Sequence, residues 1–267
     1  MIYNAQNGCL KISNTKMDYI CFGTGKENLI MIPGLGDGLK TVKGMALSFA
    51  LMYRKLACKY RVFVFSRRNI LPEGFSTEDM AKDLNKAMEQ LGIQSAYILG
   101  ISQGGMIAQY LAICHPEKVK KLILAVTLSR QNETIQNVVN NWINMAKAGD
   151  YRGIMIDTAK KTYSEKYWKK IRWMYYLLSG IGRPQSFSRF IVQANACLTH
   201  DAHAKLKNIQ CPTLIIGGEK DQIVTGKASI DMKKQIYNSK LVMYKKLGHG
   251  AYEEAKDFFS RVIDFCD

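Results

Sequence analysis

The chain has 267 residues, of which 47% are hydrophobic, so it is long enough to bury one sizeable core and lies outside the disordered and low-complexity classes. The 38 basic and 22 acidic residues give a formal charge of +16, but lysine is spread along most of the chain rather than gathered into a nucleic-acid-binding arm. We therefore expect one globular domain without a nucleic-acid partner.

The amino-terminal segment MIYNAQNGCL has neither a basic stretch leading into an apolar one nor a small-residue cleavage site. No window reaches about 18 consecutive apolar residues, the length of a membrane span, so we expect a soluble protein with no stable membrane insertion. The seven cysteines are scattered, with no CxxC pair and no histidine at metal-ligand spacing. They are typical of reduced thiols in the cytoplasm and predict no metal site.

Along the first half of the chain, the apolar pattern alternates between strands and helices. A hairpin is predicted at 9–13 and 17–23. Strands are predicted at 28–32, 61–66, 96–100 and 121–128, and helices at 41–57, from Ser76 to about Leu91, and at 106–114. Short connections between these elements predict an α/β fold, with a parallel sheet covered by helices on both faces.

From about Ser129 to Leu206 the pattern becomes helical, with no clear strand and many Trp, Tyr, Met and Lys residues. The alternation then resumes, with strands at 211–218 and 241–247 and helices near 228–237 and 252–265. We therefore predict a core of residues 1–128 and 207–267 and a helical cap insertion of residues 129–206.

The densest basic stretch of the chain, KKTYSEKYWKKIR at 160–172, lies within this insertion and interleaves aromatic residues. A solvated helix face is the favoured interpretation, and a helix lying on a membrane surface is the alternative.

Ser102 lies in the sequence LGISQGG, between Gly100 and Gly104, directly after a predicted strand and before a predicted helix. In this context the pattern G-x-S-x-G is typical of a nucleophile elbow, a strained turn that exposes the serine hydroxyl. Strand and helix nearly touch there, so a larger side chain two residues from the serine would collide with the backbone. Ser102 is the predicted nucleophile, and a packing turn is the alternative.

A serine hydroxyl becomes a good nucleophile only when a base takes its proton, and His249 is the best candidate for this base. It lies in the sequence LGHG directly after a predicted strand. His115 closes the helix that follows Ser102 and is interpreted as a capping residue. His200 and His203, in LTHDAHAKL, are expected to line a pocket or to lie at the surface, since no third metal ligand accompanies them.

The acid that orients the base is predicted to be Asp221. It follows the strand PTLII in the sequence GGEKDQIV, so its carboxylate is expected at the carboxyl edge of the sheet, where parallel sheets place their sites. Asp201 precedes its strand and Asp231 lies within a predicted helix, which makes both weaker candidates. The order serine, aspartate, histidine along the chain is a known order for a catalytic triad. A surface ion pair is the alternative role for Asp221.

The glycine-rich sequence IPGLGDG at 32–38 follows a buried strand and offers free backbone N–H groups. The N–H groups of Leu35 and Gln103 are predicted to converge on the oxyanion that develops when the serine attacks an acyl group. A plain glycine turn is the alternative.

These segments resemble the α/β-hydrolase superfamily, in particular its cofactor-independent serine hydrolases with a helical cap. The resemblance covers most of the chain through PGLGDG, GISQGG, HPEKVKKLIL, CPTLIIGGEKD and LGHG. It implies a mostly parallel eight-stranded sheet with helices on both faces, and no cofactor. Pro33 departs from this pattern, because many relatives have a histidine before the oxyanion-loop glycine. We therefore expect the contacts that hold this loop in place to differ from those in the relatives, whereas its N–H groups are still present.

The resemblance also separates the reactions of this superfamily. Its haloalkane dehalogenases and epoxide hydrolases use an aspartate where this chain has Ser102. Its carbon–carbon bond hydrolases usually have tryptophan after the catalytic histidine, where this chain has Gly250. Hydrolysis of a small to medium apolar carboxylic ester through an acyl-enzyme is therefore the predicted function. Thioesterase, acyltransferase and carbon–carbon bond hydrolase activities are the alternatives, as is a non-catalytic ligand receptor that keeps the fold.

Overall fold

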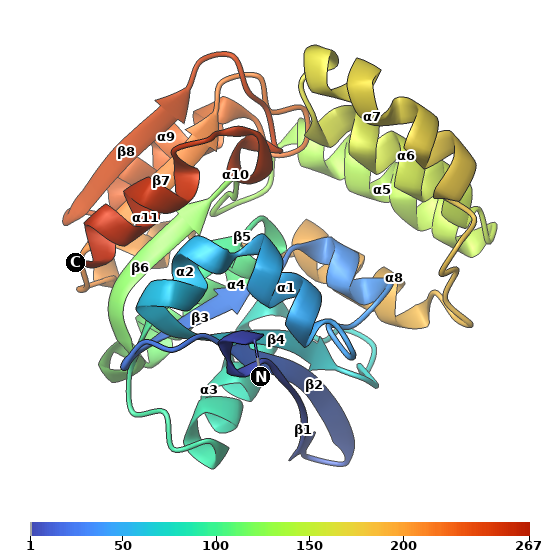
Figure 1. The fold of residues 1–267 in the computed structure, drawn as a ribbon. Coiled ribbons are helices and arrows are strands. Elements are labelled where there is room, and N and C mark those ends of the chain that lie inside the picture. Colours follow the sequence, from blue (N-terminus) through green and yellow to red (C-terminus); the bar gives the residue numbers. More distant parts are fainter. Residues whose placement is uncertain (1) are drawn as a thin grey trace.

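A computed structural model describes residues 2–267, which form an eight-stranded sheet flanked by helices (Figure 1). The strands are β1 (Gln6–Ile12), β2 (Thr15–Phe22), β3 (Glu27–Ile32), β4 (Tyr60–Arg68), β5 (Ala96–Ile101), β6 (Val119–Ala125), β7 (Thr213–Gly218) and β8 (Ser239–Tyr244). Their order is β1-β2-β4-β3-β5-β6-β7-β8, with antiparallel pairing from β1 through β2 to β4 and parallel pairing elsewhere. The predicted α/β class with a mostly parallel eight-stranded sheet is confirmed.

Helices cover both faces of this sheet. They are α1 (Ala46–Met52), α2 (Arg54–Lys59), α3 (Thr77–Gln90), α4 (Gln103–Cys114), α5 (Glu133–Lys147), α6 (Tyr151–Thr162), α7 (Glu165–Leu178), α8 (Ser188–Leu198), α9 (Gly226–Gln235), α10 (Ala251–Glu254) and α11 (Phe258–Cys266), with short 3-10 helices η1 (Ile2–Asn4), η2 (Leu35–Gly38), η3 (Pro116–Lys118) and η4 (His203–Asn208). Helices α3, α4 and α9 bury apolar side chains in one cluster, and α1, α2 and α11 do so in another. Strand β7, next to the edge strand β8, is buried along its whole length, because helices cover it on both sides.

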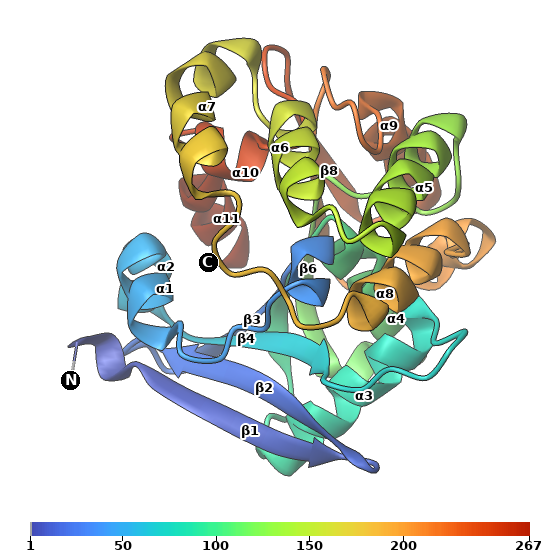
Figure 2. The same cartoon turned by 90° about the vertical axis from the view of Figure 1, so that its right-hand side faces the viewer.

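Helices α5 to α8 are inserted between β6 and β7, where no strand occurs in the described chain. Helix α6 packs between α5 and α7, and α8 contacts both α5 and η2 (Figure 2). Residues of α5 and α8, such as Ile135, Val139 and Phe190, share a buried cluster with Leu35 and Met106 of the core. The insertion is therefore packed against the loops at one end of the sheet. No helix among residues 2–267 is long and apolar enough to cross a membrane.

Two predicted helices, at 41–57 and 252–265, are wrong as single elements. The first begins only at Ala46, because Val42 N–H donates to Ser66 Oγ (2.9 Å) and holds the preceding loop against the sheet. It is then interrupted at Tyr53, where φ is −102° and ψ is 31°.

The second is divided into α10 and α11, with extended backbone at Ala255 (ψ 116°). Glu254 of α10 accepts a hydrogen bond from Ser164 N–H (2.8 Å), whereas α11 buries Phe258 against the sheet. The two halves therefore pack on different neighbours, and one straight helix cannot satisfy both.

Candidate active site

Ser102 occupies the turn between β5 and α4 with a φ of 53°, a left-handed conformation that residues other than glycine rarely adopt. A Cβ added at Gly100 would lie 2.5 Å from the carbonyl oxygen of Gly104, and one added at Gly104 would lie 1.9 Å from that of Ile32. Backbone atoms cannot yield that much, so both positions require glycine. Thr127 Oγ1 donates a hydrogen bond of 2.7 Å to the Ser102 carbonyl and helps to hold the strained turn.

His249 and Asp221 follow β8 and β7, at the same carboxyl end of the sheet as Ser102. The Nδ1 of His249 lies 2.8 Å from Oδ2 of Asp221, and both side chains are buried. The other carboxylate oxygen accepts hydrogen bonds from the N–H groups of Ile223 (2.8 Å) and Val224 (2.9 Å).

These partners keep Asp221 ionised. Burial by itself would raise the pKa of Asp221, but the charge of His249, its hydrogen bond and the two backbone N–H donors outweigh burial and lower the pKa. An ionised carboxylate only accepts hydrogen bonds, so Nδ1 of His249 carries the proton that they share. The other nitrogen of a neutral His249, Nε2, is then free to accept a proton.

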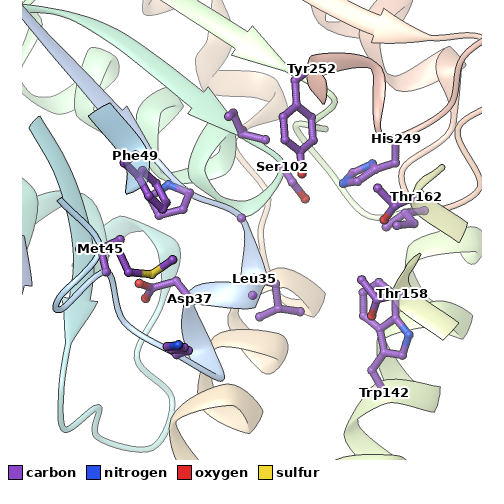
Figure 3. Close-up of a pocket in the computed structure, with 17 residues that line it drawn as sticks. Leu35, Asp37, Met45, Phe49, Ser102, Trp142, Thr158, Thr162, His249 and Tyr252 are labelled. Atoms are coloured by element: carbon purple, nitrogen blue, oxygen red, sulfur yellow. The ribbon is translucent and has the colours of Figure 1, made fainter. Parts of the chain in front are cut away.

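Ser102 and His249 line one cavity of about 360 Å³. Figure 3 shows the imidazole of His249 pointing toward Ser102, while Tyr252 extends toward the serine from another side. The lining residues come from the loops after the strands, from α1 and α10, and from the inserted helices α5 and α6: Pro33, Gly34, Leu35, Gly36, Asp37, Lys40, Val42, Met45, Phe49, Ile101, Ser102, Trp142, Thr158, Thr162, Ile223, His249 and Tyr252. Most of these side chains are apolar, so the cavity is suited to an apolar ligand.

A second cavity of about 120 Å³ shares part of this lining, including Phe49, Ile101 and Tyr252. It continues from there to Tyr53 and Val64, between α1 and the sheet. The two cavities therefore adjoin, and the second is an apolar extension of the first.

The two predicted oxyanion donors lie at helix N-termini. Leu35 is the first residue of η2 and Gln103 the first of α4, where backbone N–H groups have no partner within the helix. Neither N–H donates a hydrogen bond within residues 2–267. A Cβ added at Gly34 would lie 3.3 Å from the Ser102 Cβ, so the loop that carries Leu35 passes close to the serine. The positions suit stabilisation of an oxyanion next to Ser102, a role that stays a prediction.

Arg67, at the carboxyl end of β4, supports the loop in which Pro33 replaces the histidine of many relatives. Its guanidinium donates to the Pro33 carbonyl, and its N–H donates to Asp37 Oδ2 at 3.0 Å. Burial lowers the pKa of Arg67 to about 10, and the charge of Asp37 opposes this shift, so the group stays protonated at neutral pH.

Arg189 of α8 ties the same loop to the insertion. One of its nitrogens lies 2.5 Å from Asp37 Oδ2, another donates to the Asp37 carbonyl, and the guanidinium also donates to the carbonyls of Arg67 and Arg68. Sequence reasoning missed Arg67 and Arg189. An arginine directly after the buried strand RVFVFS was an available signal for the first, whereas Arg189 has no signal in the pattern of its helix.

The other acids and histidines considered in the sequence lie elsewhere. Asp201 is exposed and accepts a hydrogen bond from His203 N–H (3.1 Å). Asp231 lies 3.7 Å from Lys234 on α9. His115 caps α4, as predicted, with its N–H bonded to the Leu111 carbonyl. None of these lines the cavity of Ser102.

His200 neither lines this cavity nor lies at the surface, so its predicted placement is wrong. It is buried in the core, edge-on against Tyr110, with Nδ1 2.9 Å from Thr77 Oγ1 and Nε2 3.3 Å from Gln109 Oε1. Thr77 of α3 and Gln109 of α4 provide hydrogen-bond partners for both ring nitrogens, so the imidazole can be buried between these helices.

His200 is expected to make the fold sensitive to acid. Burial lowers the pKa of His200 to about 4, below the ordinary histidine value of about 6.5. Between these values the unfolded chain binds a proton that the folded chain excludes, so the free energy of unfolding falls as the pH falls through this window. The full loss is about 3 kcal/mol, and thermal unfolding at successive pH values measures it.

His200→Gln removes the ionisable group while keeping an amide for its partners, and it is expected to flatten this pH dependence. His115→Gln, at a half-buried histidine, is the matched control and should keep the wild-type slope. Equal slopes in wild type and His200→Gln would contradict the prediction.

Comparison with known proteins places this chain in a family. The family described as "alpha/beta hydrolase fold" matches residues 27–256. A 2-hydroxy-6-oxononadienedioate/2-hydroxy-6-oxononatrienedioate hydrolase of Pseudomonas putida is 28% identical over 264 residues, which cover 94% of this chain and 91% of the relative.

Solved structures share the fold over nearly the whole chain. An alpha/beta hydrolase enzyme from a Medee basin deep-sea metagenome library has a TM-score of 0.85 at 23% identity, with 97% of each chain covered. An enol-lactonase from Burkholderia xenovorans LB400 has a TM-score of 0.83 at 18% identity, covering 97% of this chain and 99% of the other. With the family match spanning most of its length, this chain belongs to the α/β-hydrolase family.

Proposed function

We propose that this protein is a serine hydrolase that cleaves carboxylic esters through an acyl-enzyme. The observation that carries the proposal is that the Asp221-bound imidazole of His249 and the hydroxyl of Ser102 share one cavity (Figure 3). In this proposal Ser102 is the nucleophile, His249 the base and Asp221 the acid that orients the base.

The proposed reaction has two halves. His249 Nε2 takes the Ser102 proton as Oγ attacks the acyl carbon, and the imidazolium then gives this proton to the leaving alcohol. Water attacks the acyl-serine with the same assistance and regenerates the free hydroxyl. In both tetrahedral intermediates the N–H groups of Leu35 and Gln103 bind the oxyanion, and one such donor is typically worth about 10² to 10³ in turnover. These steps use only water and side chains or N–H groups of the chain.

The surroundings of Gly250 favour an ester over a carbon–carbon bond. Its N–H donates a 2.7 Å hydrogen bond to the Thr162 carbonyl of α6. A Cβ there would lie 3.0 Å from that carbonyl oxygen and 3.0 Å from Tyr163 Cδ1. Both contacts are tighter than ordinary van der Waals contact, so the tryptophan that usually follows the catalytic histidine in carbon–carbon bond hydrolases would fit only if these neighbours at the end of α6 moved by a few tenths of an ångström.

The charges around the cavity support an uncharged substrate. The Pseudomonas putida relative is named for a dienedioate, which carries two carboxylates. Among the cavity-lining residues here, Lys40 is exposed and Asp37 is an anion. The guanidinium groups of Arg67 and Arg189 are already paired with Asp37 and with main-chain carbonyls. A dianion in this cavity would lack buried cationic partners, which is costly.

We also propose that residues 129–206 act as a cap on a core of residues 1–128 and 207–267. Trp142 of α5 and Thr158 and Thr162 of α6 line the cavity opposite Met45 and Phe49 (Figure 3). The inserted helices thus contribute one wall, and side chains on this wall are expected to set the length of acyl group that fits.

A substrate panel tests the proposal. The expected result is that p-nitrophenyl esters from acetate to octanoate are hydrolysed with a kcat/KM at least about 100-fold above that for 2-hydroxy-6-oxononadienedioate, because a dianion is left unpaired in this cavity. Cleavage of the dienedioate with the higher kcat/KM would reject the ester assignment and favour carbon–carbon bond hydrolysis. No turnover of either would favour the receptor alternative.

Thr158→Phe tests the cap within the same panel, since it narrows the cavity at α6. It is expected to shift the preference toward shorter acyl groups. Thr134→Phe, on α5 and outside the cavity lining, is the matched control. An unchanged acyl preference in a folded Thr158→Phe protein would contradict the role of the cap.

A further inference from the structure

Helix α7 buries none of its residues, although its sequence EKYWKKIRWMYYLL is rich in large apolar side chains. Its inner side packs toward α6, where Arg152 donates a 3.0 Å hydrogen bond to the Tyr176 carbonyl. On the outer side, Trp173 is 66% exposed and Leu177 is 70% exposed. Residues four apart on a helix are neighbours, so these two side chains form a continuous apolar surface. A surface of this kind marks an interaction site more often than a single exposed leucine does.

Helix α1 exposes a second apolar group, Leu47, Leu51 and Met52. Figure 2 shows α1 and α7 on the same side of the molecule. Helix α1 lines the cavity through Phe49, and α6, which packs beside α7, lines the opposite wall. Of the twelve exposed large hydrophobic side chains in the described chain, eight lie on α1 and α7 and a ninth, Ile181, lies just after α7. We call them the apolar rim: Leu47, Leu51, Met52, Trp173, Met174, Tyr176, Leu177, Leu178 and Ile181.

Basic side chains lie beside the apolar rim, on α7 and on the segments that flank α1. Lys166 and Lys170 are exposed and precede Trp173 and Leu177 by seven residues each, which places them on the same face of α7. On either side of α1, the exposed basic residues are Lys43, Arg54 and Lys55. A helix with Trp and Leu beside lysines has the composition of helices that lie in the headgroup region of a membrane.

We propose that the apolar rim docks on an anionic lipid surface. A second copy of this chain fits less well, because each copy would bring the same exposed lysines to the contact and carries a formal charge of +16. An anionic bilayer complements these charges and accepts apolar side chains at its interface. This assigns the part of the basic stretch that lies on α7, residues 165–172, to a membrane surface, with α7 lying on the bilayer rather than crossing it.

Docking of this kind would place the cavity beside the lipid. The inner side of α1 lines the cavity through Phe49, while its outer side carries Leu47 and Leu51. Apolar molecules dissolved in the bilayer would then reach the cavity without crossing much water. The docking itself does not depend on the proposed ester hydrolysis, and its test measures binding alone.

Co-sedimentation with sucrose-loaded vesicles tests the proposal. The wild-type protein is expected to bind vesicles of phosphatidylcholine with 30% phosphatidylglycerol at least about tenfold more strongly than vesicles of phosphatidylcholine alone, and to lose this binding at high salt. Trp173→Glu with Leu177→Glu, and separately Lys166→Glu with Lys170→Glu, should each weaken binding to the anionic vesicles at least about tenfold.

Matched controls change the same kinds of residue elsewhere. Ile70→Glu with Tyr237→Glu replaces two other exposed apolar residues, and Lys207→Glu with Lys240→Glu replaces two other exposed lysines. Both control proteins should retain vesicle binding within about threefold of wild type. All variants should keep the wild-type circular dichroism spectrum and the wild-type reactivity of Ser102 toward a small fluorophosphonate, since none of these residues lines the cavity.

Three outcomes would overturn the proposal. Equal weakening by the control pairs would mean that binding follows overall charge and not the apolar rim. Absence of binding to the anionic vesicles would exclude a lipid surface directly. Self-association in sedimentation velocity that Trp173→Glu with Leu177→Glu abolishes, without vesicle binding in wild type, would assign the rim to a second copy of the chain.

Discussion

Ser102→Ala is expected to lower kcat for p-nitrophenyl butyrate by at least about 10⁴-fold while leaving the fold intact. The variant removes the oxygen that attacks the acyl group, and neither His249 nor the N–H groups of Leu35 and Gln103 can replace it. Alanine keeps a Cβ, so the strained backbone at position 102, with φ of 53°, changes little. Steady-state kinetics and a melting temperature close to that of wild type are the two measurements.

Covalent labelling gives the independent check. A fluorophosphonate should label wild type on the peptide that contains Ser102, as located by mass spectrometry, and should not label Ser102→Ala. Ser129→Ala is the matched control, because Ser129 also faces a histidine, at 2.9 Å from His203 Nδ1, but lies outside the cavity. Labelling of another residue, or full activity in Ser102→Ala, would rule out Ser102 as the nucleophile.

Asp221→Asn is expected to lower kcat about 10³- to 10⁴-fold with little change in KM. The carboxylate now accepts the Nδ1 proton of His249 at 2.8 Å, which leaves Nε2 free as a base. An amide at this position can donate to Nδ1 instead, so the neutral imidazole would carry its proton on Nε2 and could not take the proton of Ser102. The imidazolium that forms during the reaction would also lose its ionised partner.

The kcat of Asp221→Asn is compared with that of a control variant at another aspartate. Asp231→Asn, which changes an ion-paired carboxylate on α9, is the control and should retain wild-type kcat within about threefold. Near wild-type kcat in a folded Asp221→Asn protein would show that another acid orients His249. Thermal unfolding shows whether Asp221→Asn reduces the fraction of folded protein. If it does, kcat is calculated per folded molecule, so that misfolding is not counted as loss of catalysis.

Periodicity was sufficient to predict the main elements of the fold. The strands β3, β5 and β7 are nearly continuous apolar runs, as expected for parallel strands covered on both faces. The start of α3 also depends on neighbouring residues, because Ser76 and Asp79, three residues apart, form a capping box there. These features depend on residues close together in the sequence, so no tertiary information was needed.

The breaks in two helices could not be predicted in the same way. Nothing in the sequence around Tyr53 is a helix breaker, and the interruption coincides with edge-on packing of Tyr53 against Phe49 and Phe259. Likewise, α10 and α11 separate because one contacts the insertion and the other the sheet. Contacts with distant segments outweigh helix propensity at both places.

For the site, the sequence by itself determined which residues end their strands at a common edge. Parallel strands deliver Ser102, Asp221 and His249 to one end of the sheet, and the glycines beside Ser102 are dictated by backbone contacts of 2.5 Å or less. Only the tertiary structure decided what surrounds them: Arg67 and Arg189 on Asp37, the burial of His200, and Thr162 against Gly250. The physical reason is that strand order and glycine spacing follow from local backbone geometry, whereas these contacts join side chains whose separation in space is set by how the inserted helices pack on the core.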